Sequence, residues 1–365
     1  MAEFDPLASA RTPDEPRFDV FTWGTVFLDI VFAGLPQPPT SGTEVFAAGM
    51  ASCPGGIANL AVATARLGLR TSLAAAFSND DYGDFCWRTL GEESIDLSCS
   101  QRFEDWHSPV TVSMSYASDR SMVTHAHPAP VDATTMIGDP PRSRAVIIDL
   151  AEDFGPESWV VRSRAAGSLV FADLGWDPEE RWDPAVLDRL GHCDAFLPNA
   201  VEATAYTRTS TPQEALYALA DLVPVAVVTN GSAGALAIDA LTGEEASVPA
   251  VSVDALDPTG AGDVFGAAFV TGTLAGWPLA DRLAFSSLSA ALALQQFGGS
   301  LAAPTWGDVA DWWRVVRGTP SPNSYQRSLQ RRYAFLEELV REVPECAHRR
   351  ATATIARRAD VQDLG

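Results

Sequence analysis

The chain has 365 residues, of which 47% are hydrophobic and 20% are charged, so it is not disordered throughout and is long enough for one large domain with an appendage. Its formal net charge of −22 repels a phosphate backbone, which argues against a general nucleic-acid binder or a binder of anionic membranes. All 25 basic residues are arginine, which excludes every mechanism that needs a lysine amine, including a P-loop lysine and a Schiff base.

The first 17 residues carry four acids and three prolines and lack the basic and apolar stretches of a signal peptide. We interpret residues 1–17 as a flexible N-terminal extension. The five cysteines are scattered along the chain without a C-x-x-C pair, so we expect neither a disulfide framework nor a zinc site. A reducing cytoplasm is the expected compartment.

From residue 18 onward, short apolar runs alternate with helical patterns. Strands that are buried on both faces and separated by helices indicate a three-layer α/β/α domain with a mostly parallel central sheet. The predicted strands are Phe18–Trp23, Val26–Phe32, Thr71–Phe77, Ala145–Leu150, Ser168–Phe171, Ala195–Leu197 and Val225–Thr229. The helical segments are Ile57–Leu67, Tyr82–Leu90, Glu157–Ala165, Pro184–Leu190, Val201–Tyr206 and Pro212–Leu222.

Residues 109–125 alternate in the manner of a β-hairpin with one exposed face. His125 and His127 share one face of that hairpin, because side chains two apart on a strand point the same way. A metal site needs more than two ligands, so we interpret both as surface histidines.

The stretch Val264–Ala280 has no charge and carries glycines at G-x-x-x-G spacing, a pattern that also occurs in pairs of membrane helices. It is short for a span and Pro278 closes it, so we interpret it as a helix buried in a globular domain. Residues 318–365 form an arginine-bearing helical tail. We expect a solvated helix that packs back on the domain, with an oligomer contact or a tether as the alternatives.

The sharpest motif is Asp257-Pro-Thr-Gly-Ala-Gly-Asp263, between a strand-like run and the long apolar helix. Gly260, Ala261 and Gly262 let the backbone approach a ligand closely and aim N–H groups outward at a helix N-terminus, which predicts an anion site for a phosphoryl group. Asp263, in the first helical turn, is either a favourable cap or a general base beside the bound phosphate. The motif alone leaves these two roles open.

Four other groups of residues are candidates for binding, and each has a purely structural alternative. Asp29 ends an apolar strand and would need a hydrogen-bonding polyol or backbone groups to satisfy it. Gly55 and Gly56 before Asn59 bring either a ligand-binding amide or only a tight turn to a helix start. Asn199 and Glu202 share a helix face, where they suit a hydrated cation or a helix cap. The glycine-rich turn at 229–234 follows a buried strand at the sheet edge where α/β folds bind ligands.

The run D-P-T-G-A-G-D-V-F-G-A-A-F resembles the C-terminal signature of the ribokinase-like carbohydrate kinases, the PfkB family. Other matching stretches follow in the order of that family, from about Phe18 to about Trp313. They are the opening Gly24-Thr-Val-Phe-Leu-Asp29, Pro54-Gly-Gly-Ile-Ala-Asn59, Asn79-Asp-Asp-Tyr-Gly83, the N-x-x-E motif from Asn199 to Glu202, and the loop from Val228 to Gly234. The resemblance implies a ribokinase-like fold over residues 18–317, with a small β-sheet lid formed by about 35–48 and 109–125. In this family two lids often pair, which implies a homodimer.

The resemblance also implies a role for each site residue. Asp263 would be the base, with Gly260, Ala261 and Gly262 as the anion hole. The sugar would be bound by Asp29, Gly55, Gly56 and Asn59, and ATP by Thr229, Gly231, Gly234 and Thr259. Mg²⁺ would lie near Asn199 and Glu202, through water, and a monovalent cation such as K⁺ near Asp257 and Thr259, with further carbonyls from 296–303.

Two departures from the family pattern leave the acceptor open. The spacing from the first glycine to Asn59 is one residue shorter than usual, and the D-x-N-x-R stretch of sugar kinases reads Asp173-Leu-Gly-Trp-Asp177 here. The expected activity is ATP-dependent phosphorylation of a hydroxyl of a small sugar. The alternatives are a nucleoside kinase, for which Phe27, Trp106 and Trp176 are candidate stacking residues, and a non-catalytic sensor of sugar or nucleotide.

Overall fold

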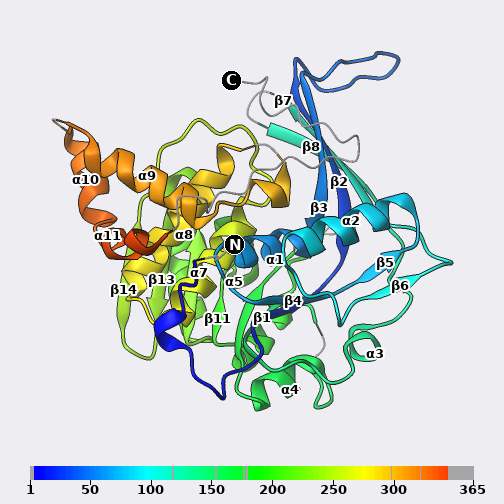
Figure 1. Ribbon diagram of the computed structural model, residues 1–365, viewed down its shortest axis with the longest axis horizontal. Coiled ribbons are helices and arrows are strands. Elements are labelled where there is room, and N and C mark those ends of the chain that lie inside the picture. The colour runs from blue at the N-terminus through cyan, green and yellow to red at the C-terminus, as the bar shows by residue number, and fades with distance from the viewer. Residues whose placement is uncertain are drawn as a thin grey trace.

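The computed structural model describes residues 4–116, 119–152, 154–175, 177, 180–296, 298–320 and 322–343. Its centre is an eight-stranded sheet with helices on both faces, and a separate four-stranded sheet stands at one side (Figure 1). The predicted α/β/α fold with a mostly parallel sheet and a small second sheet is confirmed.

The central sheet has the order β14-β13-β12-β11-β10-β9-β1-β4. Its first six strands in chain order are mutually parallel, and the last two add an antiparallel edge. The strands are β1 (Phe18–Trp23), β4 (Thr71–Ala74), β9 (Ser143–Asp149), β10 (Leu169–Asp173), β11 (Ala195–Phe196), β12 (Val225–Thr229), β13 (Ala235–Asp239) and β14 (Glu244–Val248). A further pair, β5 (Ala76–Ser78) and β6 (Gln101–Phe103), lies apart from it.

Alternation along each buried strand divides the core into two layers. On β9, Ala145 and Ile147 pack on one face of the sheet, and Val146 and Ile148 pack on the other. The first face is covered by α1 (Ile57–Arg66), α7 (Ala261–Leu274), α8 (Leu279–Leu294) and α9 (Trp306–Gly318). The second is covered by α3 (Ala133–Ile137), α4 (Trp159–Ala165), the 3-10 helix η2 (Pro184–His192), α5 (Ala200–Thr207) and α6 (Pro212–Ala220). The helix α2 (Asp81–Glu92) packs beside α1.

The small sheet, called the lid here, has the order β3-β2-β7-β8. Its strands are β2 (Val26–Leu35), β3 (Gly49–Gly56), β7 (Val110–Tyr116) and β8 (Asp119–His125). The segment 35–48, predicted to form part of the lid sheet, is instead mainly the loop between β2 and β3. The reason is that β2, which the sequence did not assign to a different sheet from β1, pairs with β3 and β7 and supplies an inner strand of the lid.

Both ends of the described chain pack on the domain. The predicted flexible extension is wrong for residues 4–17, because Leu7 is 1% exposed and the ring of Phe4 contacts Trp306 with centroids 4.7 Å apart. Arg11 also pairs with the buried Asp19 at 2.5 Å. In the tail, α10 (Ser324–Arg332) and α11 (Leu336–Leu339) bury apolar side chains in the main core. The remainder of the predicted tail, 344–365, lies outside the described residues.

Within the described ranges, no helix has the length and apolar character needed to cross a bilayer. The uncharged stretch at Val264–Ala280 is divided among α7, the turn that follows it and the start of α8. Val264, Phe265 and Phe269 of α7 are buried in the core of the domain, as the sequence predicts.

Arg66 ties α1 to two distant segments. Its Nε and Nη2 atoms donate to the two carboxylate oxygens of Glu93, each at 2.9 Å. Its Nη1 atom donates to the carbonyl oxygens of Leu301 and Ala303, each at 2.8 Å. Because the Arg66 side chain is almost fully buried, these four hydrogen bonds offset the loss of hydration of the guanidinium.

We expect Arg66→Ala to lower the free energy of unfolding by about 3–5 kcal/mol, because it leaves Glu93 and two carbonyl groups buried without their partner. Urea denaturation followed by circular dichroism measures the change. The control is Arg17→Ala, which removes an ion pair to Asp96 whose arginine side chain is 72% exposed. That control should cost less than about 1 kcal/mol, and equal losses in the two variants would contradict the prediction.

Candidate active site

The loop before α7 presents a helix N-terminus with no capping side chain. Gly260 is the N-cap residue and adopts a left-handed conformation with φ of 76°, which favours glycine. Because Gly260 has no side chain to cap the first turn of α7, this end of the helix is open to a ligand. This arrangement suits an anion, as the sequence predicts for Gly260, Ala261 and Gly262.

Asp263 stands in the first turn of the same helix and is bound by Asn59 of α1. The Asn59 Nδ2 atom donates to Asp263 Oδ2 at 3.0 Å, which joins two motifs 204 residues apart in the sequence. Burial raises the pKa of Asp263 to about 6, although the hydrogen bond from Asn59 and the charge of Arg120 both act to lower it. A carboxyl with a pKa near neutrality is suited to accept a proton.

Asp29 lies on β2 and faces the same region. Its side chain is buried against Gly55 of the neighbouring strand, where a Cβ atom would lie 1.9 Å from Asp29 Oδ2. Only glycine therefore fits at position 55. Burial raises the pKa of Asp29 to about 7, and the negative charges of Asp257 and Asp263 raise it further, against the charge of Arg120. The three carboxyl groups are thus close enough to interact electrostatically.

Gly56 makes the sharp change from β3 to α1 that places Asn59. Its φ is 63°, and a Cβ atom there would lie 2.4 Å from the carbonyl oxygen of Thr25. The ring of Phe27 lies beside the same point, at 2.7 Å from that Cβ position. Of the other proposed stacking residues, Trp106 donates from Nε1 to the Pro128 carbonyl oxygen at 3.1 Å, and Trp176 lies outside the described residues.

A pocket of about 500 Å³ adjoins the N-terminus of α7. It brings together the predicted nucleotide loop and the predicted anion hole, which sequence reasoning could connect only through the family resemblance. Its walls include Thr229, Gly231, Gly234, Ala261 and Gly262, with small and apolar residues of α8 behind them. A mostly apolar pocket with few polar groups, next to an anion site, is suited to a nucleotide.

Arg120 is a site residue that sequence reasoning missed. It comes from β8 of the lid, and its Nη1 atom donates to Thr259 Oγ1 at 2.7 Å. The signal was available in the composition, since a chain without lysine can bring only arginine to a phosphoryl site as a permanent cation. What the sequence did not show is that the hairpin folds back over the loop 257–260.

Asn199 and Glu202 form a capping box at the start of α5. Asn199 Oδ1 accepts from the backbone N–H groups of Val201 at 2.9 Å and Glu202 at 3.0 Å, and Glu202 Oε2 accepts from the Asn199 N–H at 2.9 Å. The capping role that the sequence left open is therefore present. Asn199 also pairs with Thr229, so the box lies beside the nucleotide loop.

Two further carboxylates, Asp149 and Asp173, lie at the carboxyl ends of adjacent strands β9 and β10, where they are register partners. Burial raises the pKa of Asp173 well above its ordinary value, and the charges of Asp263 and Glu202 raise it further. Burial likewise raises the pKa of Asp149 and of Glu202. Mutually repelling carboxylates are complementary to a divalent cation with oxygen ligands, so this group fits Mg²⁺.

Asp257 is 2% exposed and has one unsatisfied oxygen. Oδ1 accepts from the Thr259 N–H at 2.9 Å, whereas Oδ2 has no hydrogen-bond partner among the residues that the structure describes. A buried carboxylate oxygen without a partner fits a cation. The sequence predicts further carbonyl ligands from 296–303, and within that segment the carbonyl oxygens of Leu301 and Ala303 accept from Arg66.

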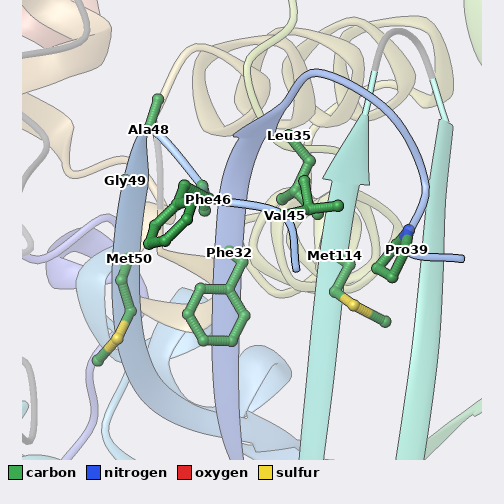
Figure 2. A pocket seen from close by; sticks show the side chains of 10 residues that line it. Phe32, Leu35, Pro39, Val45, Phe46, Ala48, Gly49, Met50 and Met114 are labelled. Carbon is green, nitrogen blue, oxygen red and sulfur yellow. The ribbon is translucent and has the colours of Figure 1, made fainter. Parts of the chain in front are cut away.

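The opposite face of the lid carries an apolar pocket of about 450 Å³ (Figure 2). Phe32, Met50 and Met114 are register partners on three adjacent strands, and Val45 and Phe46 of the loop after β2 complete the pocket. Side chains alternate along β2, so Phe32 and Asp29, three residues apart, face opposite ways. The pocket is lined without ionisable groups and is therefore not part of the carboxylate site.

Comparison with known proteins identifies the family. The sequence profile described as "pfkB family carbohydrate kinase" matches residues 42–306, well over half of the chain. A fructokinase from Klebsiella pneumoniae is 31% identical over 301 residues, covering 76% of this chain and 92% of that protein. A nucleoside kinase from Methanothermobacter thermautotrophicus is 27% identical over 278 residues, covering 73% of this chain and 86% of that protein.

Solved structures show the same fold. The ribokinase from Arabidopsis thaliana, complexed with ribose and ATP, superposes with a TM-score of 0.65 at 20% identity and covers 81% of this chain and 98% of its own. A protein assigned as ribokinase II from E. coli, in complex with ATP and Mg²⁺, has a TM-score of 0.66 at 22% identity, with 78% and 95% covered. The α/β/α domain with a lid is the architecture that these kinases share with this chain.

We expect the free energy of unfolding of Asp29→Asn to increase relative to that of the wild type as the pH rises. The pKa of Asp29 is raised in the folded chain, so the unfolded chain ionises first, and wild-type stability is lost from about pH 4 to about pH 7. Asparagine does not ionise, so the variant does not lose stability over this pH interval for that reason. In urea denaturation, the difference between variant and wild type should grow by about 2–3 kcal/mol between about pH 5 and about pH 8.

The matched control for the substitution itself is Asp105→Asn, on an exposed loop. A difference for Asp29→Asn that does not grow with pH would show that its carboxyl ionises in the folded chain as it does in water.

Proposed function

The chain belongs to the pfkB family of carbohydrate kinases, and we propose that it transfers the γ-phosphoryl group of ATP to a hydroxyl of a small sugar, with Asp263 as the general base. It is a sugar or nucleoside kinase of the ribokinase family, and the proposal adds the acceptor class and the roles of the residues. The observation that carries it is the hydrogen bond from Asn59 to Asp263, because it unites the two family motifs at the N-terminus of α7.

In the proposed reaction the sugar lies between Asp29 and Asp263. Asp29 would accept hydrogen bonds from its hydroxyl groups, and Asn59 would donate to them. Gly55 leaves room for the carboxylate of Asp29, and the backbone of Gly55 and Gly56 would lie beside the sugar. Asp263 takes the proton of the attacking hydroxyl while the oxygen bonds to the γ-phosphorus and the bond to ADP breaks.

The N–H groups of Gly260, Ala261 and Gly262 would stabilise the charge that develops on the transferred phosphoryl group. The glycine at the N-cap of α7 supports this role, since it has no side chain to cap the first turn of the helix. The pocket at Thr229, Gly231 and Gly234 would hold the nucleoside part of ATP. Thr259 supports the same end of the site through its contact with the lid.

Cations would be held on both sides of the phosphate site. Mg²⁺ fits the carboxylate group of Asp149, Asp173 and Glu202 beside Asn199, with water between, and would neutralise charge on the nucleotide phosphates. A monovalent cation such as K⁺ fits Asp257, whose buried Oδ2 has no hydrogen-bond partner in the described part of the chain.

Arg120 would bring the positive charge of the lid to the site. Its contact with Thr259 places a guanidinium beside the phosphate loop, where it also opposes the repulsion among Asp29 and Asp263. A permanent cation here favours the charged transition state of phosphoryl transfer. The lid would thereby complete the site when it covers the substrate and excludes water.

A nucleoside is the second candidate acceptor, because the aromatic ring of Phe27 lies against Gly56 at the proposed sugar site. Such a ring could stack on a base. ADP release measured against a panel of pentoses, hexoses, keto-sugar acids, polyols and nucleosides separates the two acceptors. Release stimulated by a nucleoside and by no sugar would replace the sugar proposal with the nucleoside one.

We expect Asp263→Asn to lower kcat by about 10² to 10⁴-fold, since asparagine cannot accept the hydroxyl proton. The measurement is ADP release with the acceptor found in the panel, together with binding of ATP by calorimetry, which should persist. The matched control is Asp281→Asn, because Asp281 holds the equivalent first-turn position of the neighbouring apolar helix α8.

Asp281→Asn should leave kcat within about twofold of wild type, because Asp281 is not one of the residues of the proposed active site. Substantial turnover in Asp263→Asn would contradict the assignment of the base, whereas absence of turnover in the wild type with every acceptor would leave the sensor alternative.

A second copy of the chain would cover the apolar pocket of the lid. Phe46, 77% exposed, lines this pocket together with Phe32, Met50 and Met114 (Figure 2). A dimer axis would place the same apolar face of two lids together, which a self-complementary contact requires. The face lies away from Asp29, so pairing would leave the substrate site open.

We expect Phe46→Asp to convert a dimer to a monomer, because it places a carboxylate in the centre of an apolar contact. Sedimentation equilibrium measures the mass. Leu241→Asp is the control, since Leu241 is 81% exposed in the turn between β13 and β14. A wild-type monomer, or equal dissociation of both variants, would contradict pairing through the lid.

A further inference from the structure

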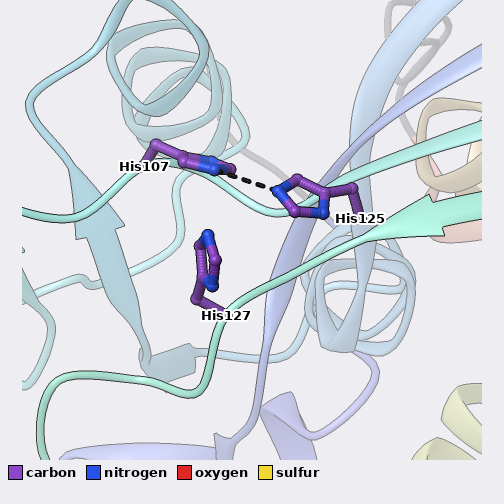
Figure 3. A group of neighbouring side chains, drawn as sticks. All are labelled: His107, His125 and His127. Carbon is purple, nitrogen blue, oxygen red and sulfur yellow. Dashed lines mark hydrogen bonds between the residues drawn. The ribbon is translucent and has the colours of Figure 1, made fainter.

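Three histidines meet at the base of the lid hairpin, where the chain enters β7 and leaves β8 (Figure 3). His107 precedes β7, His125 ends β8 and His127 follows it. All three are exposed, and one ring nitrogen from each lies within 4.8 Å of the other two. We propose that this histidine triad binds one divalent transition-metal ion, of which Zn²⁺ is the representative.

The spacing of the nitrogens suits tetrahedral coordination. His107 Nε2 and His125 Nε2 are 3.2 Å apart. Two nitrogens of a tetrahedral site with bonds of about 2.0 Å are about 3.3 Å apart, so this pair needs little movement. The ring centroids form a nearly equilateral triangle with sides of 5.0, 4.9 and 5.0 Å. Three imidazole ligands leave a fourth position for water.

The tautomer of His107 is the one that a metal requires. Its Nδ1 atom is 3.0 Å from the carbonyl oxygen of Ser108, and because a carbonyl only accepts, Nδ1 carries the hydrogen. In the neutral ring, the lone pair is then on Nε2, the atom that faces His125. Backbone carbonyls commonly orient metal-binding imidazoles in this way.

The two arms of the triad are fixed by contacts that do not involve a metal. Ser108 donates from its N–H and from Oγ to the carboxylate of Asp80, each at 2.8 Å. Trp106 Nε1 donates to the Pro128 carbonyl oxygen, which joins the segment before β7 to the segment after β8. The ligands are therefore brought together by the fold, and binding an ion orders few additional groups.

The position of the triad assigns it a role in holding the lid. β8 runs from the region of Arg120, which contacts the phosphate loop, to His125 in the triad. An ion bound at His107, His125 and His127 links the start and the end of the hairpin. Binding to the folded state alone would stabilise the folded chain in proportion to the logarithm of the metal concentration. Imidazole nitrogens select zinc, copper and nickel ions over Mg²⁺, so this site is distinct from the carboxylate site.

The test is a Zn²⁺ titration of untagged protein in competition with a chromophoric chelator. One equivalent should bind to the wild type, and His107→Ala and His125→Ala should each weaken binding by more than about 100-fold. The control is His192→Ala, an exposed histidine of η2 that stands apart from the triad and contacts Phe154. Circular dichroism confirms that each variant is folded.

Co²⁺ spectra separate the triad from the cysteines. The expected spectrum has visible d–d bands and no thiolate charge-transfer band, and it disappears in His107→Ala and His125→Ala. Zn²⁺ affinity unchanged in these variants, a thiolate band that persists in them, or no binding by folded wild type would each overturn the proposal.

Discussion

Repulsion among carboxylates is the constraint on which the site depends. Asp29, Asp257 and Asp263 come from β2, from the loop before α7 and from α7 itself, and their mutual charge helps to raise the pKa of Asp29 to about 7. Two groups oppose this repulsion: Asn59 donates to Asp263, and Arg120 contributes a positive charge from the lid. The folded chain keeps a cluster that is unfavourable in isolation and complementary to cations and to polyhydroxylated ligands.

The fold explains how so few residues can build this cluster. A parallel sheet delivers the carboxyl ends of its strands to one edge, where Asp149 and Asp173 lie side by side and the loop after Thr229 follows. The lid is a separate sheet at one side of the central sheet. Asp29 lies on strand β2 of the lid, and Arg120 lies on strand β8. Arg66 fixes α1 to the segment at Leu301, and this steadies the helix that carries Asn59.

Sequence predicted what is local in the chain. The glycine-rich turns at Gly55–Gly56 and at 260–262, and the helix that begins after Gly260, follow from residue type and order, and the structure has them. The assignment of Val26–Phe32 to a strand was also correct, but period alone does not say which sheet a strand joins. β2 joins the lid because it pairs with β3 and β7, and its pairing partners lie 16 or more residues away along the chain.

What sequence missed is brought together only by crossings in three dimensions. Arg120 reaches Thr259 across 139 residues, and the charges of Asp263 and Glu202 act on Asp173 from other elements. His107 joins His125 and His127, which lie close to each other in the sequence, to form the triad. The capping box at Asn199 and Glu202 is a local motif that the sequence located, but sequence alone could not decide its role. A helix cap and a cation site use the same residue types at the same spacing.

The most direct measurement is the pH dependence of kcat/KM for the wild type and for Asn59→Leu. The acidic limb of the wild-type profile should report Asp263 near pH 6, because the base acts only when ionised. Loss of the hydrogen bond from Asn59, which lowers the pKa of Asp263, should move that limb to higher pH in the variant. A limb at the same pH in both proteins would contradict the claim that Asn59 tunes Asp263 as the catalytic base.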